Sequence, residues 1–415
     1  MTLPDYFEFC CPVQIVSGHR ALEQIPPLLR GLKASRPLIV TDAGVSGAGL
    51  VETVAAAVEA QIDIVGVEDD VPPDSDLDAV KRIAGAYRSA NADAIIAVGG
   101  GSVMDTAKGV NLMVSENSDD LMTFTGAGAL KRRLNPLVAV PTTAGTGSEV
   151  TLVAVIKNRE RRLKMLFTST FLLPDAAVLD SRMTLSLPPA LTAATAMDAL
   201  THAVEAYTCL QKNPLSDAHA TAAIELIRRH LLRVVGHPED RDGRLALANA
   251  ATLAGIAFSN AMVGMVHTLG HSVGAVCQVP HGVCMAVLLP YGLEYNFHKN
   301  AHLTAELLLP LAGVEPAATT PAHLRAERVI AAIRQLNQHL HEATGGRHPR
   351  NLAEIRDRND RPMVPAERLA DIAEKALADG SIFYNPEELD FADFLMVLEA
   401  AWRGEPLDRS RIRKV

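Results

Sequence analysis

The sequence changes character near residues 186–189, and this change constrains the fold more than any other feature. Before it, short runs of β-branched residues alternate with amphipathic helical patterns, which predicts an α/β domain with a parallel sheet. We predict strands at residues 37–41, 62–67, 94–98, 137–141 and 178–180. Helical patterns, such as those over residues 49–60 and 77–90, lie between them.

A hairpin is predicted from residues 151–157 and 162–168, with the charged turn 158–161 between the two runs. From Pro188 onward, Ala/Leu-rich segments with helical periodicity replace the strand patterns. We predict helices at residues 190–210, 216–235, 243–260 and 322–344, then an exposed connection over 345–362 and a last helical pair. The expected domains are therefore an α/β domain, residues 1–187, and an all-α domain, residues 188–415.

Composition excludes several classes of protein. The 39 basic and 48 acidic residues give a formal charge of -9, which argues against a nucleic-acid or membrane-surface partner. We find no uncharged apolar run of about 18 residues, the length that a membrane-spanning helix needs. The five cysteines form no CxxC pair, which favours reduced thiols, and no secretory signal opens the chain. The expected location is the cytoplasm.

Two glycine-rich turns follow predicted strands. Gly99–Ser102 (GGGS) opens a helix, where bare backbone N–H groups and the helix N-terminus favour a phosphate. The same turn could simply be tight and closely packed, since neither GxGxxG nor a Walker motif is present. The second turn, Pro141–Glu149, is rich in hydroxyls and glycines that suit ribose and pyrophosphate oxygens. Both turns should lie at the carboxyl edge of the sheet, where α/β sheets bind ligands.

Asp42 lies at the end of the first predicted strand, residues 37–41. An acidic side chain there can bind the adenosine ribose and repel a 2′-phosphate, which favours NAD over NADP. The alternative is that Asp42 caps a helix or turn.

The helical half contains a cluster of residue types that bind metals. Asp198 and His202 are four residues apart, and so are His267 and His271, so each pair shares a helical face. His281 follows Pro280 in a PHG turn. One Asp and three imidazoles suit a divalent first-row metal, which leaves one histidine for another role. The alternatives are core histidines and, as a rival ligand, a thiolate from the nearby Cys277 or Cys284.

Four segments together resemble the iron-containing (group III) alcohol dehydrogenases: GGGSVMDTAK, PTTAGTGSEVT, MDALTHAVEAY and HTLGHSVGAVCQVPHG. The resemblance extends over nearly the whole chain, with the motifs in family order. It implies a Rossmann-like α/β domain followed by an all-α domain, the dehydroquinate synthase-like architecture, with the active site between them. It also implies a homodimer or a higher homo-oligomer.

The resemblance assigns roles residue by residue. The metal ligands that it implies are Asp198, His202, His267 and His281, and His271 then lies near the substrate and the nicotinamide as the catalytic histidine. The cofactor-binding positions that it implies are Asp42, Gly100, Gly101, Ser102, Asp105, Thr142, Thr143, Thr146, Ser148, Val155 and Lys164. Many members have an Asn-Pro pair near the adenine, where this chain has Asp69–Ser75 instead, which puts the contacts there in doubt.

The function that the resemblance implies is reversible hydride transfer between a primary alcohol or diol and NAD. A divalent metal, Fe2+ first and Zn2+ as the alternative, would act as Lewis acid on the substrate oxygen. His271 would relay the proton to solvent. The alternatives are a lyase of the dehydroquinate-synthase type, a polyol dehydrogenase of the glycerol dehydrogenase type and a non-catalytic NAD sensor. The sequence does not specify which alcohol or aldehyde is the substrate.

Overall fold

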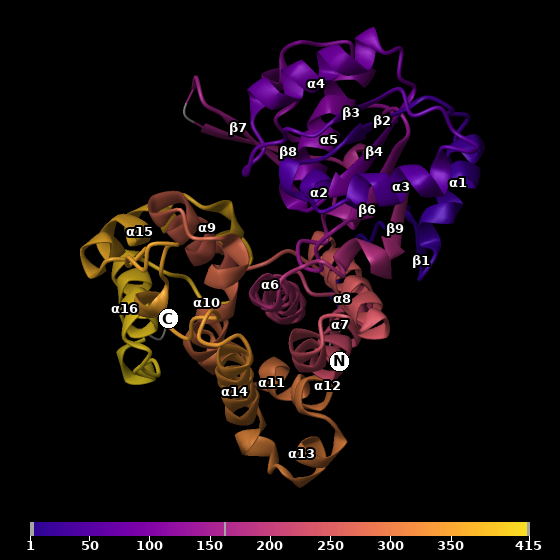
Figure 1. Ribbon diagram of the computed structural model, residues 1–415. Coiled ribbons are helices and arrows are strands. Elements are labelled where there is room, and N and C mark those ends of the chain that lie inside the picture. Colours follow the sequence, from indigo (N-terminus) through magenta and orange to yellow (C-terminus); the bar gives the residue numbers. More distant parts are fainter. Residues whose placement is uncertain (1–3, 162, 413–415) are drawn as a thin grey trace. The chain divides into compact units, whose positions relative to one another are not determined.

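The computed structural model describes residues 4–161 and 163–412, so Arg162 of the predicted hairpin lies outside the described residues. The chain forms two compact units (Figure 1). Of the described residues, the α/β unit comprises 10–161, 163–187 and 239–259, and the helical unit comprises 4–9, 188–238 and 260–412. The predicted fold class, a parallel-sheet domain with a helical domain, is confirmed.

The α/β unit is built on a six-stranded parallel sheet with strand order β1-β9-β6-β4-β2-β3. Its strands are β1 (Gln14–Gly18), β2 (Pro37–Val40), β3 (Gly66–Glu68), β4 (Ala94–Gly99), β6 (Leu137–Pro141) and β9 (Ala176–Asp180). Its helices are α1 (Ile25–Gly31), α2 (Ala43–Gly47), α3 (Leu50–Val58), α4 (Leu77–Ser89), α5 (Gly101–Ser115) and α8 (Arg241–Ser259). The central strands are buried along their whole length, as expected where helices cover both faces of a sheet.

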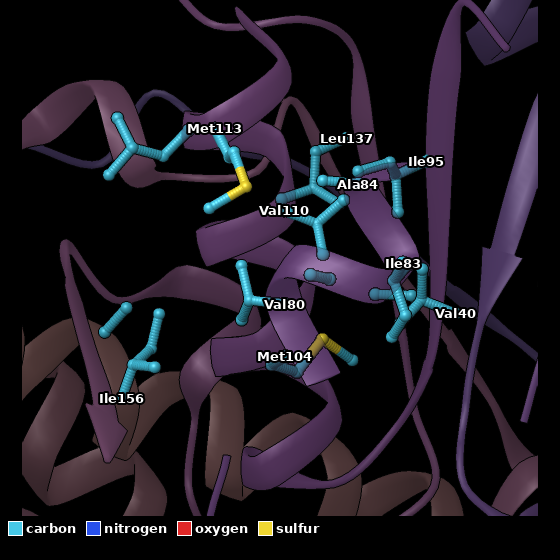
Figure 2. Packing of buried hydrophobic residues seen from close by; sticks show 14 of the residues in the cluster. Val40, Val80, Ile83, Ala84, Ile95, Met104, Val110, Met113, Leu137 and Ile156 are labelled. Carbon is cyan, nitrogen blue, oxygen red and sulfur yellow. The ribbon is translucent and has the colours of Figure 1, made fainter. Parts of the chain in front are cut away.

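Successive side chains of β4 point to opposite faces of the sheet and join two separate cores. Ile95 belongs to the core formed with α4 and α5, whereas Ile96 and Val98 belong to the core formed with α1 and α3. Figure 2 shows the first of these cores, with Val80 and Val110 among the helix side chains that it labels. The two cores therefore cover the two faces of the sheet.

The sequence-based strand predictions differ from the structure at the sheet edges. The run 62–67 forms a ladder only at β3, which begins four residues after the expected start. As an edge strand, β3 has a single neighbour, β2. Strand β1 lies at the other edge and was not predicted. The hairpin is present as β7 (Val153–Asn158) and β8 (Leu163–Thr168), which pair antiparallel and are joined by β5 (Gly126–Ala127) in a second, three-stranded sheet.

The α8 helix belongs to the α/β unit, whereas the expected division placed it in the helical domain. It approaches the second glycine-rich turn closely, because a Cβ added at Gly255 would lie 2.8 Å from the Gly147 Cα. Thr252 also donates a hydrogen bond to Glu149, at 2.7 Å. Sequence periodicity gives the helix but not the unit that it packs against.

The helical unit contains α6 (Pro189–Thr208), α7 (Pro214–Gly236), α9 (Met265–Cys277), α10 (His281–Tyr295), α11 (Phe297–Glu306), α12 (Leu308–Ala312), α13 (Val314–Thr319), α14 (Arg325–Ala343), α15 (Leu369–Ala376) and α16 (Phe391–Arg403). None of the helices in the described part of the chain is long and apolar enough to cross a bilayer. One expectation is corrected: His281 is the first residue of α10 rather than part of a turn, because Pro280 is the N-cap and has the extended backbone of an N-cap residue.

We predict that Gly255→Ala destabilises the α/β unit by about 1–3 kcal/mol, as overpacking does in a close-packed core. The added Cβ would lie 2.9 Å from both the Gly147 carbonyl oxygen and the Val150 Cγ2. Thermal unfolding followed by circular dichroism measures the effect. The matched control is Gly85→Ala in α4, where nothing lies within 4 Å of the added Cβ, and which should be neutral or stabilising by up to about 1 kcal/mol. Equal melting temperatures for both variants would contradict the close approach.

Candidate metal cluster and dinucleotide-binding turns

Four side chains of the helical unit converge on one point, and we call them the metal cluster: Asp198, His202, His267 and His281. Their ligand atoms all lie within 4.8 Å of one another. The Asp198 Oδ1 atom lies 3.8 Å, 4.0 Å and 3.4 Å from the Nε2 atoms of the three histidines in that order. Ligands bound about 2.1 Å from one ion in a tetrahedron lie about 3.4 Å apart. The cluster therefore has the dimensions of a divalent metal site.

Three helices carry the residues of the metal cluster. Helix α6 carries Asp198 and His202 one turn apart, and it is buried almost all round from Thr192 onward. A Cβ added at Gly282 would lie 2.4 Å from the Ala194 carbonyl oxygen, so glycine lets the start of α10, and with it His281, approach α6. His267 lies in the first turn of α9. Helix packing thus brings together residues that are far apart in sequence.

The polar atoms of the cluster fit a cation. The Asp198 Oδ1 and the His267 Nε2 atoms are buried and have no hydrogen-bond partner among the described residues, although buried polar atoms normally have one. A divalent ion would satisfy both atoms. One carboxylate and three imidazoles are also a ligand set that Fe2+ and Zn2+ both accept.

The protonation states also suit a metal. Burial opposes ionisation of Asp198, but the surrounding imidazoles outweigh it and hold the pKa of this carboxyl well below its usual range. Burial lowers the pKa of His202 to about 3 and holds that of His267 well below its usual value. An ionised carboxylate and neutral imidazoles are the forms that bind metals, and Asp198, His202 and His267 are in these forms near neutral pH.

His271 lies beside the cluster but is not one of its four members. Its ring stacks on His281 with centroids 5.3 Å apart, and its side chain is 42% exposed. Its Nδ1 atom lies 2.9 Å from the Asp379 Oδ2, and Asp379 also caps the short 3-10 helix η9 (Gly380–Tyr384). The structure thus gives His271 a carboxylate partner that fixes its ring.

Two carboxylates that contact these histidines, Asp379 and Glu205, were not predicted from the sequence. Glu205 lies three residues after His202 in α6, so it shares the helical face of the two α6 ligands. Burial raises the pKa of Glu205 to about 7. An acidic residue within the apolar run HAVEAY was a signal that could have identified Glu205. Nothing local marks Asp379, which is 108 residues away from His271.

In the α/β unit, the two glycine-rich turns lie side by side, as their expected place at the carboxyl edge requires. Gly99 and Pro141 are register partners at the ends of β4 and β6. A Cβ at Gly100 would lie 3.2 Å from the Thr143 Oγ1, and one at Gly101 would lie 3.1 Å from the Thr146 Cγ2. Gly100 is the N-cap of α5, whose first N–H groups are therefore open to an anion.

Other expected cofactor positions make contacts of their own. Asp42 is the N-cap of α2, where its Oδ1 accepts hydrogen bonds from the Gly44 and Val45 N–H groups at 2.8 Å and 3.0 Å. Ser102 accepts one from the Asp74 N–H, at 3.2 Å. The Asp69–Ser75 segment, which departs from the family pattern, therefore contacts the start of α5.

A buried ion network holds the second turn and the hairpin together. The Asp105 carboxylate accepts hydrogen bonds from the Ser148 hydroxyl, at 3.1 Å, and from the Val155 N–H, at 3.0 Å. The buried Lys108 ammonium donates to the carbonyl oxygens of Thr151 and Val153, at 2.8 Å and 2.9 Å. Burial lowers the pKa of Lys108 to about 8, against the opposing charge of Asp105.

Of the remaining expected positions, Thr142 lies buried at the end of β6, with its N–H donating to the Gly99 carbonyl at 3.1 Å. Lys164 is exposed on β8, opposite Lys157 of β7. The structure thus brings the residues of the two turns and Asp105 together, and Lys164 lies out on the hairpin.

Family models match both units. The model for "Iron-containing alcohol dehydrogenase" matches residues 12–181, and the model for "Fe-containing alcohol dehydrogenase family, C-terminal" matches residues 192–402. A 1,3-propanediol dehydrogenase of Klebsiella pneumoniae is 36% identical over 386 residues, 92% of this chain and 95% of that protein. An NAD-dependent methanol dehydrogenase of Bacillus methanolicus is 36% identical over 337 residues, 80% of this chain and 86% of that protein.

Solved structures agree with these matches. A 1,3-propanediol oxidoreductase superposes with a TM-score of 0.89 at 34% identity, covering 96% of this chain and 100% of that one. An alcohol dehydrogenase from Oenococcus oeni superposes with a TM-score of 0.88 at 34% identity, with the same coverage.

We predict that Lys108→Met weakens the binding of a nicotinamide dinucleotide at least tenfold and lowers the melting temperature. The buried oxygens around Lys108 would lose their donor and Asp105 its counter-charge, a loss that costs about 3–5 kcal/mol at buried pairs. Titration calorimetry with NAD measures the first effect. The matched control, Lys81→Met on the exposed face of α4, should change neither quantity. Wild-type affinity in a folded Lys108→Met protein would contradict the role of this ammonium.

Proposed function

Because the chain belongs to the iron-containing alcohol dehydrogenases, which are NAD- and metal-dependent oxidoreductases, we propose that the metal cluster holds the catalytic metal. A single observation carries this proposal: four potential ligand atoms lie within 4.8 Å of one another. Two of these atoms, the Asp198 Oδ1 and the His267 Nε2, are buried without a hydrogen-bond partner among the described residues.

The proposed reaction is reversible hydride transfer between a primary alcohol or diol and NAD. When bound, the metal supplies a Lewis acid for the substrate oxygen, and NAD supplies the hydride acceptor. His271 carries the proton between substrate and solvent. Its 42% exposed side chain reaches solvent, and Asp379 holds the proton at Nδ1, which leaves Nε2 as the atom that exchanges a proton.

The two glycine-rich turns are the proposed NAD site. Backbone N–H groups and hydroxyls at the start of α5 and in the second turn bind the phosphates and riboses. The residues proposed to do so are Gly100, Gly101, Ser102, Thr142, Thr143, Thr146 and Ser148, with Val155 and Lys164 toward the nicotinamide. Asp105 is proposed to act through Ser148 and Val155, because it hydrogen-bonds to both; it is a positioning residue.

The proposed substrates are small primary alcohols, diols and their aldehydes. Relatives that are 36% identical are a methanol dehydrogenase and a 1,3-propanediol dehydrogenase. A sugar-phosphate lyase is disfavoured, because both family models and the relatives named above are alcohol dehydrogenases. Fe2+ is the proposed metal and Zn2+ the alternative. A homo-oligomeric state and a cytoplasmic location stay predictions.

We predict that His267→Ala and His271→Gln have different effects, because only His267 is a proposed ligand. His267→Ala should lose the metal and lower turnover by at least a thousandfold, whereas His271→Gln should retain the metal and lower turnover by about 10²–10⁴-fold. Elemental analysis of the purified proteins and NADH absorbance with 1,3-propanediol measure the two quantities. Full turnover by metal-free His267→Ala would refute the ligand assignment. Absence of NADH formation by the wild-type protein with a panel of alcohols would favour the lyase.

We predict that Asp42→Asn relaxes the preference for NAD without destabilising the protein. Asparagine caps a helix as well as aspartate does, so the bonds to the Gly44 and Val45 N–H groups persist, while the charge that repels a 2′-phosphate is removed. Relative kcat/KM for NADP over NAD should rise about tenfold, equivalent to about 1.4 kcal/mol of repulsion. An unchanged ratio at unchanged melting temperature would show that Asp42 is only a cap.

A further inference from the structure

Helix α9, which carries His267, begins without a capping side chain of its own. Its N-cap is Gly264, so its first N–H groups need acceptors from elsewhere. The Glu205 Oε1, from α6, accepts a hydrogen bond from the Val266 N–H at 2.8 Å. The Asn385 Oδ1 accepts one from the Met265 N–H at 3.2 Å. Two side chains distant in sequence therefore cap the helix that presents His267.

A side chain at the N-cap would crowd these two partners. A Cβ at Gly264 would lie 2.8 Å from the Asn385 Oδ1 and 3.2 Å from the Glu205 Oε1. Asn385 is itself held by Asn296, because each side-chain amide donates to the other at 2.9 Å. The cap is thus a buried and ordered polar network rather than an incidental contact.

The second carboxylate oxygen of Glu205 contacts the ligand itself. The Glu205 Oε2 is directly hydrogen-bonded to the His267 Nδ1. The Oε1 is an acceptor for a backbone N–H, so in its ionised form Glu205 accepts on both oxygens and the shared proton lies on the His267 Nδ1. The other ring nitrogen, Nε2, is then the deprotonated one, and it lies 4.0 Å from the Asp198 Oδ1, within the metal cluster.

We propose that Glu205 is the positioning residue that fixes the tautomer and the ring orientation of His267 for metal binding. This inference rests on the proposed metal site. Both side chains are buried, so the imidazole pairs with the carboxylate rather than with bulk water. Helix α6 therefore supplies two ligands, Asp198 and His202, and the residue that orients a third. A metal-bound histidine whose other ring nitrogen donates to a carboxylate is held in one tautomer and is a more basic ligand.

The discriminating variant is Glu205→Gln. The site needs two acceptors, one for the Val266 N–H and one for the His267 Nδ1–H, and a glutamine amide offers only one. We expect its affinity for Co2+, measured by competition with a chelator on the metal-free protein, to fall about 10–100-fold. The visible absorption of bound Co2+ should also change, because it reports the ligand geometry. Glu205→Asp keeps both acceptors on a shorter side chain. Its Co2+ affinity should lie between those of the wild-type protein and Glu205→Gln.

The matched control is Thr208→Val, one turn further along α6. Thr208 is also buried, and its hydroxyl donates to the Val204 carbonyl at 2.9 Å, without contact to a ligand. This variant should keep wild-type Co2+ affinity and absorption. Circular dichroism of the metal-free proteins shows which variants are folded, and Glu205→Asp serves if Glu205→Gln is not.

Wild-type affinity and an unchanged Co2+ spectrum in folded Glu205→Gln would overturn the role of Glu205. If this variant is unfolded, the same result in Glu205→Asp would overturn it. The outcome is separable from the proposed function. If His267→Ala loses the metal while Glu205→Gln keeps it, the metal site stands and only the role of Glu205 fails. If His267→Ala keeps the metal, the site itself fails.

Discussion

The approach of three imidazoles to one carboxylate oxygen is the interaction on which the helical unit depends. The Asp198 Oδ1 lies 3.4–4.0 Å from three Nε2 atoms, too far for good hydrogen bonds and close enough to share an ion. Helices α9 and α10 carry their ligands in their first turns and pack against each other, and the buried helix α6, which packs against α10, carries the other two. The metal cluster therefore depends on the packing of these helices, because a shift of either helix would separate the ligands.

Carboxylates from other elements stand behind the histidines. Glu205 contacts the Nδ1 of His267, and Asp379 contacts the Nδ1 of His271. The first is buried in the protein and the second is part-exposed. The difference matches the proposed roles, because a ligand must keep one tautomer while a proton relay must reach solvent. The same pairing of imidazole and carboxylate thus serves two tasks, and burial separates them.

In the α/β unit, buried charges hold the two glycine-rich turns in place. The buried Lys108 ammonium binds the carbonyl oxygens that follow the second turn, and Asp105 binds that turn and β7. A buried ammonium is costly unless most of its donors are satisfied, and here Ser148 and Thr151 add further acceptors. The backbone N–H groups of the turns are then available to bind a ligand.

The sequence by itself determined the fold class, most helices, the central strands and the four residues of the metal cluster, through periodicity and through motifs that resemble a family. Local patterns carry this information because each helix or strand sets the spacing of the residues that share one of its faces. Only the tertiary structure decided that α8 packs in the α/β unit, that His281 begins a helix, and that Glu205 and Asp379 support histidines 62 and 108 residues away. These facts depend on long-range packing and on close approaches at glycines such as Gly255 and Gly282, which no short stretch of sequence encodes.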